Sequence, residues 1–262
     1  MVVSTEAPPR ARRVTVVGRD GEPANERQVA PPRPGPLLAV CGVCGGAGAS
    51  TLAYLFALAG ARETRQPVLV ADTGGPTGGL AALAGVEAPR SLPELADHVA
   101  AGLTPQDGLY AIDHSGVRVL ATGPEFGSTG APKRLTGLLI HAREAHALTV
   151  VDCSTLARPE DRAAATAGTH LAWVMPATKQ GATRARRVLE AAPRLQTGEI
   201  LVARHDVRGA KVPLRALRHL ASERGAPLVL MPYVASLDEG KPDRALEQAQ
   251  VSVQAILGAL TR

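Results

Sequence analysis

The sequence predicts an α/β fold in which a doubly wound, mostly parallel sheet carries helices on both faces. Short, continuous apolar segments are typical of strands buried on both faces of such a sheet. They alternate with helical segments at the spacing of strand–helix units, and a glycine-rich turn joins the first strand to the first helix. At 262 residues, with 45% hydrophobic and 20% charged residues, the chain is long and apolar enough for one sizeable core.

The predicted elements follow one another along the chain from residue 37. Strands are expected at residues 37–41, 67–71, 117–121, 148–151, 170–175, 199–203 and 227–231. Helices are expected at residues 50–62, 91–101, 136–147, 159–167, 179–192, 212–224 and 242–260. Ser91 and Glu94 form a capping-box pattern that marks the start of the second helix. The first helix is apolar on all sides from Leu52 to Ala59, so we expect it to be deeply buried.

The first 36 residues differ in composition from the rest of the chain. They are rich in Pro, Arg and Glu, and their one β-like run is Val14–Val17. We expect residues 1–36 to form a mostly flexible arm that is closed by the proline-rich linker Pro31–Gly35. Residues 37–262 are predicted to form the folded domain.

The glycine-rich turn spans Gly42–Thr51. A phosphate-binding loop (P-loop) uses glycines so that successive backbone N–H groups can converge on a phosphate. It also uses a Ser or Thr at the helix start to hold Mg²⁺ and a lysine that reaches the phosphates. The predicted phosphate-binding residues are Gly45, Gly46, Gly48, Ala49, Ser50 and Thr51, with Ser50 as a magnesium ligand and Ala49 at the position of the lysine. The loop is therefore complete apart from its main charge.

Two predicted strands are followed directly by an aspartate, Asp72 and Asp152. Nucleotide sites on sheets of this kind lie at the carboxyl ends of the strands. Asp152 follows a mostly apolar strand, and we predict that it holds Mg²⁺ through water. The alternative is that both are turn residues, because Asp is common where a strand gives way to a turn. Two such aspartates beside a glycine-rich loop favour a binding site.

Five segments together carry a resemblance to a known family: Gly45–Ala53, Val68–Leu80, Leu148–Asp152, Val174–Ala177 and Met231–Pro242. Over residues 37–260 the chain resembles the deviant Walker-A P-loop ATPases of the ParA/MinD family, and within it the branch of TadZ/CpaE and septum-site-determining-like proteins. The resemblance implies a P-loop NTPase-like fold and a module that positions a pilus, secretion or cell-division assembly through a protein partner. It further implies a homodimer, ATP or ADP with Mg²⁺ as the cofactor, and weak non-specific DNA binding through the basic residues between Arg184 and Arg218.

The chain departs from this family at three positions that carry charge. Cys44 stands in the place of the signature lysine, Ala49 in that of the P-loop lysine, and Gly74 in that of a water-positioning aspartate. No lysine precedes Lys133, so a neighbouring lysine in the first third of the chain cannot replace either one. We therefore predict a pseudo-ATPase with weak or no hydrolysis and no catalytic residues.

Two other functions stay open at this point. An active ATP-dependent switch would need an arginine in place of the lysine, either Arg134 or one supplied by a partner chain. A Rossmann-type dinucleotide site would use the turn at Gly46–Gly48 and place Asp72 on the ribose, but Thr51 occupies the position of its third glycine.

The remaining features set limits on the function. Cys41, Cys44 and Cys153 could form a redox or metal cluster, but three thiols without an obvious histidine partner favour small buried residues. The net charge of +5, carried mostly by arginine, permits an anionic partner. The N-terminus lacks the apolar core of a signal peptide, and no stretch approaches the roughly 18 apolar residues of a membrane span. We therefore expect a cytoplasmic protein with no transmembrane segment.

Overall fold

The computed structural model describes residues 34–261, apart from residues 65, 75–78, 88–89, 124–129, 193, 195–196, 207–208, 210 and 236–240. The arm predicted for residues 1–36 lies outside the described residues as far as Arg33, and so does its β-like run. Pro34 to Pro36 are joined to the folded domain by backbone hydrogen bonds. The Gly35 amide donates to the Arg143 carbonyl (2.7 Å), and the Thr149 amide donates to the Pro36 carbonyl (3.0 Å).

The described residues form an eight-stranded sheet with the strand order β3-β4-β2-β5-β1-β6-β7-β8. Its strands are β1 (Leu37–Gly42), β2 (Val68–Asp72), β3 (Ala111–Ile112), β4 (Arg118–Leu120), β5 (Leu148–Asp152), β6 (His170–Pro176), β7 (Gly198–Arg204) and β8 (Leu228–Met231). Neighbouring strands pair in parallel except for β3 and β4, which pair antiparallel at one edge. At the centre, Val40 of β1 lies opposite Asp152 of β5 and Ala172 of β6. The carboxyl ends of these three strands therefore meet at one edge of the domain.

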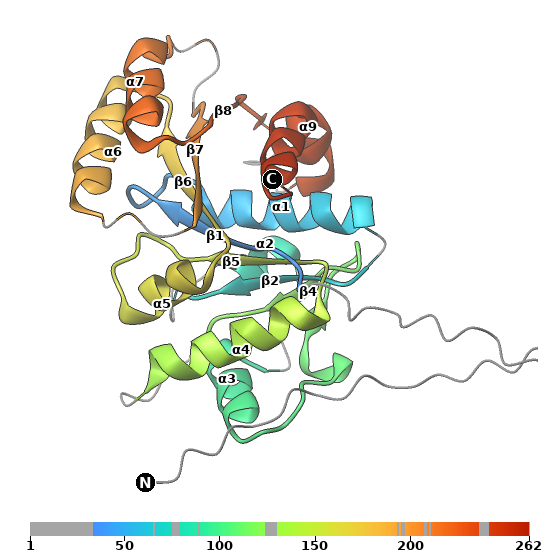
Figure 1. Ribbon diagram of the computed structural model, residues 1–262. Helices are drawn as coiled ribbons and strands as arrows, with labels where there is room; N and C mark the ends of the chain where they lie inside the picture. The colour runs from blue at the N-terminus through green and yellow to red at the C-terminus, as the bar shows by residue number, and fades with distance from the viewer. Residues whose placement is uncertain are drawn as a thin grey trace, which may run out of the picture. The chain divides into compact units, whose positions relative to one another are not determined.

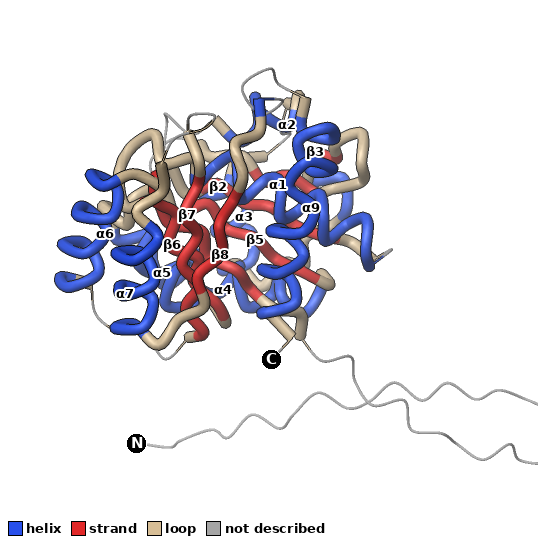
Figure 2. Tube along the Cα trace, turned by 90° about the horizontal axis from the view of Figure 1, so that it is seen from above, coloured by secondary structure: helices blue, strands red, loops and turns tan. Residues whose placement is uncertain are grey.

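Helices cover both faces of the sheet (Figures 1 and 2). They are α1 (Ala49–Thr64), α2 (Leu80–Ala84), α3 (Leu92–Ala100), the short 3₁₀ helix η2 (Asp107–Leu109), α4 (Ala131–Ala145), α5 (Pro159–Ala167), α6 (Lys179–Ala191), α7 (Leu214–Arg224) and α9 (Pro242–Ala259). Because alternate strand residues point to opposite faces, β1 contributes to two apolar cores. Leu38 and Val40 pack with α1, α2 and α9, whereas Leu37 and Ala39 pack with α3 to α7.

The first helix is buried as its composition predicts. Residues Leu52 to Gly60 of α1 are buried between the sheet and α9, which lies beside α1 in Figure 1. An amphipathic helix would leave a polar face for solvent, but α1 has a packing partner on both sides. Its position matters for the site, because its first residues follow the glycine-rich loop directly.

The structure confirms the predicted fold class and most of the predicted elements. The capping box at Ser91 and Glu94 is present, with the Ser91 amide donating to the Glu94 carboxylate (2.8 Å). Three elements differ from the prediction, because their signals in the sequence are short or weak. Helix α4 begins at Ala131 rather than at residue 136, because Pro132 is compatible with the first turn of a helix. Helix α2 and strand β3 were not predicted, since five and two residues are too short to show a period.

Candidate phosphate-binding site

The loop between β1 and α1 curls back on itself in a conformation that depends on its glycines. Gly46 and Gly48 have φ angles of +74° and +92°, a region that residues with a Cβ atom disfavour. The Gly42 amide donates to the Ser154 carbonyl (2.6 Å), which fastens the start of the loop to the turn after β5. The loop therefore lies at the carboxyl ends of the central strands, where open α/β sheets bind ligands.

The loop forms one wall of a hollow of about 350 Å³. The hollow brings together all six predicted loop residues, and it is lined by Cys44, Gly45, Gly46, Ala47, Gly48, Ala49, Ser50, Thr51, Ser154, Thr155 and Arg204. The N-terminus of α1 opens into it, so free backbone N–H groups and the positive end of the helix dipole face the same space. Such an arrangement favours the binding of an anion, phosphate above all.

Asp152 ends β5, is 2% exposed, and accepts hydrogen bonds from the Ser50 side chain and from the Ser154 amide (3.1 Å). Burial raises the pKa of Asp152 to about 6; the Ser50 hydrogen bond opposes this rise, and the nearby Asp72 carboxylate adds to it. A hydroxyl beside a buried carboxylate supplies the oxygen ligands that Mg²⁺ prefers. The two predicted magnesium ligands, Ser50 and Asp152, are thus in contact, and they fit the ion that a nucleotide would bring.

Asp72 lies opposite Asp152 in the register of β2 and β5, and neither aspartate is among the described residues that line the hollow. The buried carboxylate of Asp72 accepts from the amides of Gly74 (2.6 Å) and Leu80 (3.3 Å), so it holds the segment that leads into α2. Burial raises the pKa of Asp72, and these two hydrogen bonds oppose the rise. The Rossmann alternative needs this carboxylate to bind a ribose hydroxyl, whereas here the carboxylate is hydrogen-bonded to two backbone amides.

Arg204, at the carboxyl end of β7, is the charged residue among the described lining residues of the hollow, and sequence reasoning missed it together with Ala47, Ser154 and Thr155. A Cβ atom built on Gly48 would lie 2.9 Å from the Cζ and Nη1 atoms of Arg204, so the guanidinium rests directly on the loop. Asp206 accepts a hydrogen bond from its Nε (3.0 Å) and forms an ion pair with its Nη2 (2.8 Å). The sequence offers one signal, an arginine just after a predicted strand, but it lies within the basic stretch between Arg184 and Arg218 that the resemblance links to DNA.

Arg134, which we considered as a replacement for the lysine, lies elsewhere. It belongs to α4 and pairs with Asp97 of α3 (2.7 Å) on the face of the sheet opposite to α1. It is not among the described lining residues of the hollow.

The three cysteines are free thiols. Cys41 and Cys153 are fully buried and in contact, whereas Cys44 is half-buried at the rim of the hollow. Burial raises the pKa of Cys153 well above its usual range, which disfavours the reactive thiolate. Within the described part of the chain no group of three or more His, Cys, Asp or Glu residues could hold a metal ion. The interpretation as small buried residues therefore holds for Cys41 and Cys153, whereas Cys44 is only partly buried.

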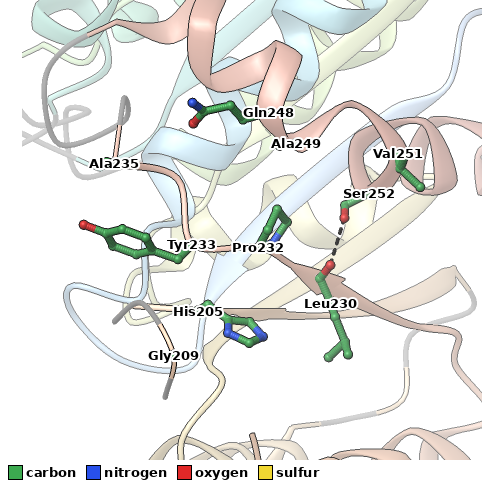
Figure 3. A pocket seen from close by; sticks show the side chains of 10 residues that line it. All are labelled: His205, Gly209, Leu230, Pro232, Tyr233, Ala235, Gln248, Ala249, Val251 and Ser252. Carbon is green, nitrogen blue, oxygen red and sulfur yellow. Dashed lines mark hydrogen bonds between the residues drawn. The ribbon is translucent and has the colours of Figure 1, made fainter. Parts of the chain in front are cut away.

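A second hollow, of about 720 Å³, lies between the end of β8, helix α9 and the segment after β7 (Figure 3). It is lined by His205, Gly209, Leu230, Pro232, Tyr233, Ala235, Gln248, Ala249, Val251 and Ser252. The Ser252 hydroxyl donates to the Leu230 carbonyl (2.8 Å) and joins α9 to this edge strand. Because His205 follows Arg204 directly, the two hollows are neighbours at the carboxyl end of β7.

No protein-family model and no curated protein sequence matches the chain. Solved structures do match it. A ParA family ATPase from Chlorobium tepidum gives a TM-score of 0.65 at 15% sequence identity, over 84% of this chain and 96% of that chain. The septum site-determining protein MinD from Pyrococcus horikoshii, complexed with Mg-ADP, gives 0.61 at 17% identity, over 83% and 92%. Cobyrinic acid a,c-diamide synthase from Mycobacterium smegmatis, with bound ADP and magnesium, gives 0.60 at 16% identity, over 82% and 93%.

The chain therefore has the fold of the ParA/MinD-type P-loop ATPases, and the fold implied by the resemblance is confirmed. At these identities the comparisons establish the fold alone. Proteins named as a septum site-determining factor and as a synthase share it, so the function has to be argued from the site. None of the helices in the described residues is both long and apolar enough to span a membrane.

Proposed function

We propose that the chain is a ParA/MinD-like pseudo-ATPase: a positioning or scaffold protein that binds a nucleotide with Mg²⁺ but hydrolyses it weakly or not at all. The observation that carries this proposal is a phosphate-binding loop that lacks its charges. The glycine loop lines the hollow and Ser50 contacts Asp152, whereas Ala49 and Gly74 stand where the resemblance places the binding lysine and the water-positioning aspartate.

The missing charges set the expected magnitudes. A hydrogen bond to a charged group contributes about 1.5–3 kcal/mol, and about 1.4 kcal/mol corresponds to a tenfold change in affinity. The loss of both lysines, at Cys44 and Ala49, would therefore weaken triphosphate binding by about two orders of magnitude or more. Hydrolysis falls further, because phosphoryl transfer depends on positioning and charge stabilisation. Bound Mg²⁺ would neutralise phosphate charge, and the residues that would hold it are Ser50 and Asp152.

The cellular part of the proposal rests on the resemblance to the TadZ/CpaE and septum-site-determining-like branch. In this proposal the protein acts in the cytoplasm, forms a homodimer through the face around the glycine loop, and positions a pilus, secretion or cell-division assembly by binding a protein partner. The exposed Gly45 and Gly46 leave this face accessible to a second copy.

Calorimetry of the purified protein with MgADP and MgATP, with mass measured by light scattering and phosphate release measured in parallel, tests the proposal. We expect binding in the high-micromolar to millimolar range and phosphate release at background. Ser50→Ala is the matched variant, and it should reduce the magnesium dependence of binding. Micromolar MgATP binding with nucleotide-dependent dimerisation and turnover would contradict the pseudo-ATPase and favour the active switch. If no binding is detected at millimolar nucleotide, the nucleotide-binding part of the proposal is wrong and only the scaffold role remains.

A second candidate function, weak non-specific DNA binding, is favoured by the surface of α6 and α7, which lie side by side in Figure 1. A groove of about 1220 Å³ between them is lined in part by Lys179, Arg186 and Arg215. Phosphate contacts of this kind weaken steeply with salt. Titration of a labelled duplex at low and high salt tests it: affinity that falls steeply with salt supports DNA binding, and no binding at low salt excludes it.

A further inference from the structure

We propose that Arg204 supplies the positive charge for phosphate binding that the loop itself lacks. This inference rests on the proposed nucleotide-binding function and names the residue that makes it feasible. The cation would come from the end of β7 rather than from the loop, so the phosphate site is built from two segments far apart in the sequence.

The contact between Arg204 and the loop carries the argument. The guanidinium is packed so closely on Gly48 that an added Cβ atom would lie within 3.0 Å of Cζ, Nη1 and Nε. The side chain is 18% exposed, and the carbonyl of Arg204 accepts from the Ala177 amide (2.7 Å), so both its ends are held. The guanidinium therefore lines the same hollow as the backbone amides of the loop.

Asp206 fixes the orientation of this guanidinium. One of its carboxylate oxygens accepts from Nε and forms an ion pair with Nη2, whereas Nη1 lies against Gly48 of the loop together with Cζ and Nε. An arginine carries its charge at every physiological pH and presents several donors in one plane, a geometry that suits phosphate oxygens. Asp206 also competes for the same cation, so it should reduce the affinity of the hollow for an anion while it keeps Arg204 in place.

Other cations do not have this position. Arg204 is the one basic side chain among the described residues that line the hollow. Arg134 is paired with Asp97 on the opposite face of the sheet, which makes it a suitable control. A replacement for the P-loop lysine has to reach the space in front of the α1 N-terminus, and in the described chain Arg204 does so.

The test measures the binding of pyrophosphate and of MgADP, by calorimetry, to the full chain and to three variants. Pyrophosphate reports on the phosphate site without a base. We expect Arg204→Ala to weaken both ligands by about tenfold to a hundredfold, as for a lost charged hydrogen bond. Arg134→Ala should bind like the wild type, and Asp206→Asn should bind more tightly because the competing carboxylate charge is gone.

The possible outcomes separate this inference from the function on which it rests. Equal binding by the wild type and Arg204→Ala, or an equal loss in Arg134→Ala, would overturn the role of Arg204 and leave nucleotide binding intact. If the wild type binds neither ligand, the nucleotide-binding function fails and the inference fails with it. Urea unfolding of each variant reports its stability. Should Arg204→Ala not fold, Asp206→Asn decides: tighter binding supports the inference, and unchanged or weaker binding overturns it.

Discussion

The buried carboxylate of Asp152 should make the protein less stable at neutral pH than at mildly acidic pH. Burial raises its pKa from 3.8 to about 6. Between these two pH values the carboxyl group is protonated in the folded state and ionised in the unfolded state. A carboxyl group with a raised pKa contributes its stabilisation fully below pH 4 and loses it as the pH rises through about 6. A shift of roughly two pKa units corresponds to ~3 kcal/mol at neutral pH.

The substitution Asp152→Asn removes this charge and keeps the shape of the side chain. Its amide oxygen can still accept from the Ser154 amide, and the side chain has the shape of the protonated carboxyl group that the wild type carries at low pH. The raised pKa already includes the hydrogen bonds of the carboxylate, so we expect the variant to be of similar stability to the wild type at pH 4 and more stable than it by about 3 kcal/mol at pH 7. Some pH dependence should remain in the variant, because burial also raises the pKa values of Asp72 and Asp161.

Urea unfolding at pH 4, 5, 6 and 7 in the presence of EDTA measures this difference. The single tryptophan, Trp173, is fully buried in β6 and provides the fluorescence signal. Glu144→Gln, on the exposed side of α4, is the control and should show no pH-dependent gain. A stability difference between Asp152→Asn and the wild type that does not change with pH, or a wild type that is more stable at pH 7, would refute the reasoning.

Three further substitutions test the loop and two buried polar contacts by the same unfolding assay. Gly48→Ala should lose about 1–3 kcal/mol, because φ is +92° and the new Cβ atom would displace the Arg204 guanidinium; an unchanged midpoint would contradict the geometry. Tyr54→Phe should lose about 1–3 kcal/mol, because the Tyr54 hydroxyl donates to the buried Asp113 carboxylate (2.7 Å); equal stability would count against that bond. Glu199→Ala should lose about 3–5 kcal/mol, because the largely buried Arg224 guanidinium loses its carboxylate partner and keeps only its bond to the Leu189 carbonyl, and a loss below 1 kcal/mol would show that the pair is solvated.

The sequence predicts the fold because its signals are local. Strands buried on both faces appear as continuous apolar runs, and the helix after the glycine loop is apolar on all sides because it packs between the sheet and α9. The position of the loop, of Ser50 and of Asp152 follows from the same local patterns. Their contact follows from one further rule, that the ends of parallel strands meet at one edge.

Arg204 and Asp72 show what local patterns leave out. Arg204 contacts Gly48 because β7 lies two strands away from β1 in the sheet, and the order of the strands is not a local property of the sequence. Asp72 has the position of a site residue, but its carboxylate is taken by the amides of Gly74 and Leu80. The direction of a side chain within a site depends on these tertiary contacts, which the spacing of residues along the chain does not specify.

Binding and hydrolysis place different demands on the hollow, and this difference leads to a final prediction. Affinity needs a positive charge that any lining element can provide, so Ala49→Lys should tighten MgATP binding about tenfold to a hundredfold. Hydrolysis also needs a group that positions water, and Gly74 has no side chain to supply one, while the nearby Asp72 carboxylate is hydrogen-bonded to the Gly74 amide (2.6 Å). Phosphate release from Ala49→Lys should therefore stay at background. Calorimetry measures the binding and a phosphate-release assay measures the hydrolysis, both on the same sample. Turnover restored by this single substitution would show that the hollow retains a catalytic group, and the pseudo-ATPase would then be wrong for a reason other than affinity.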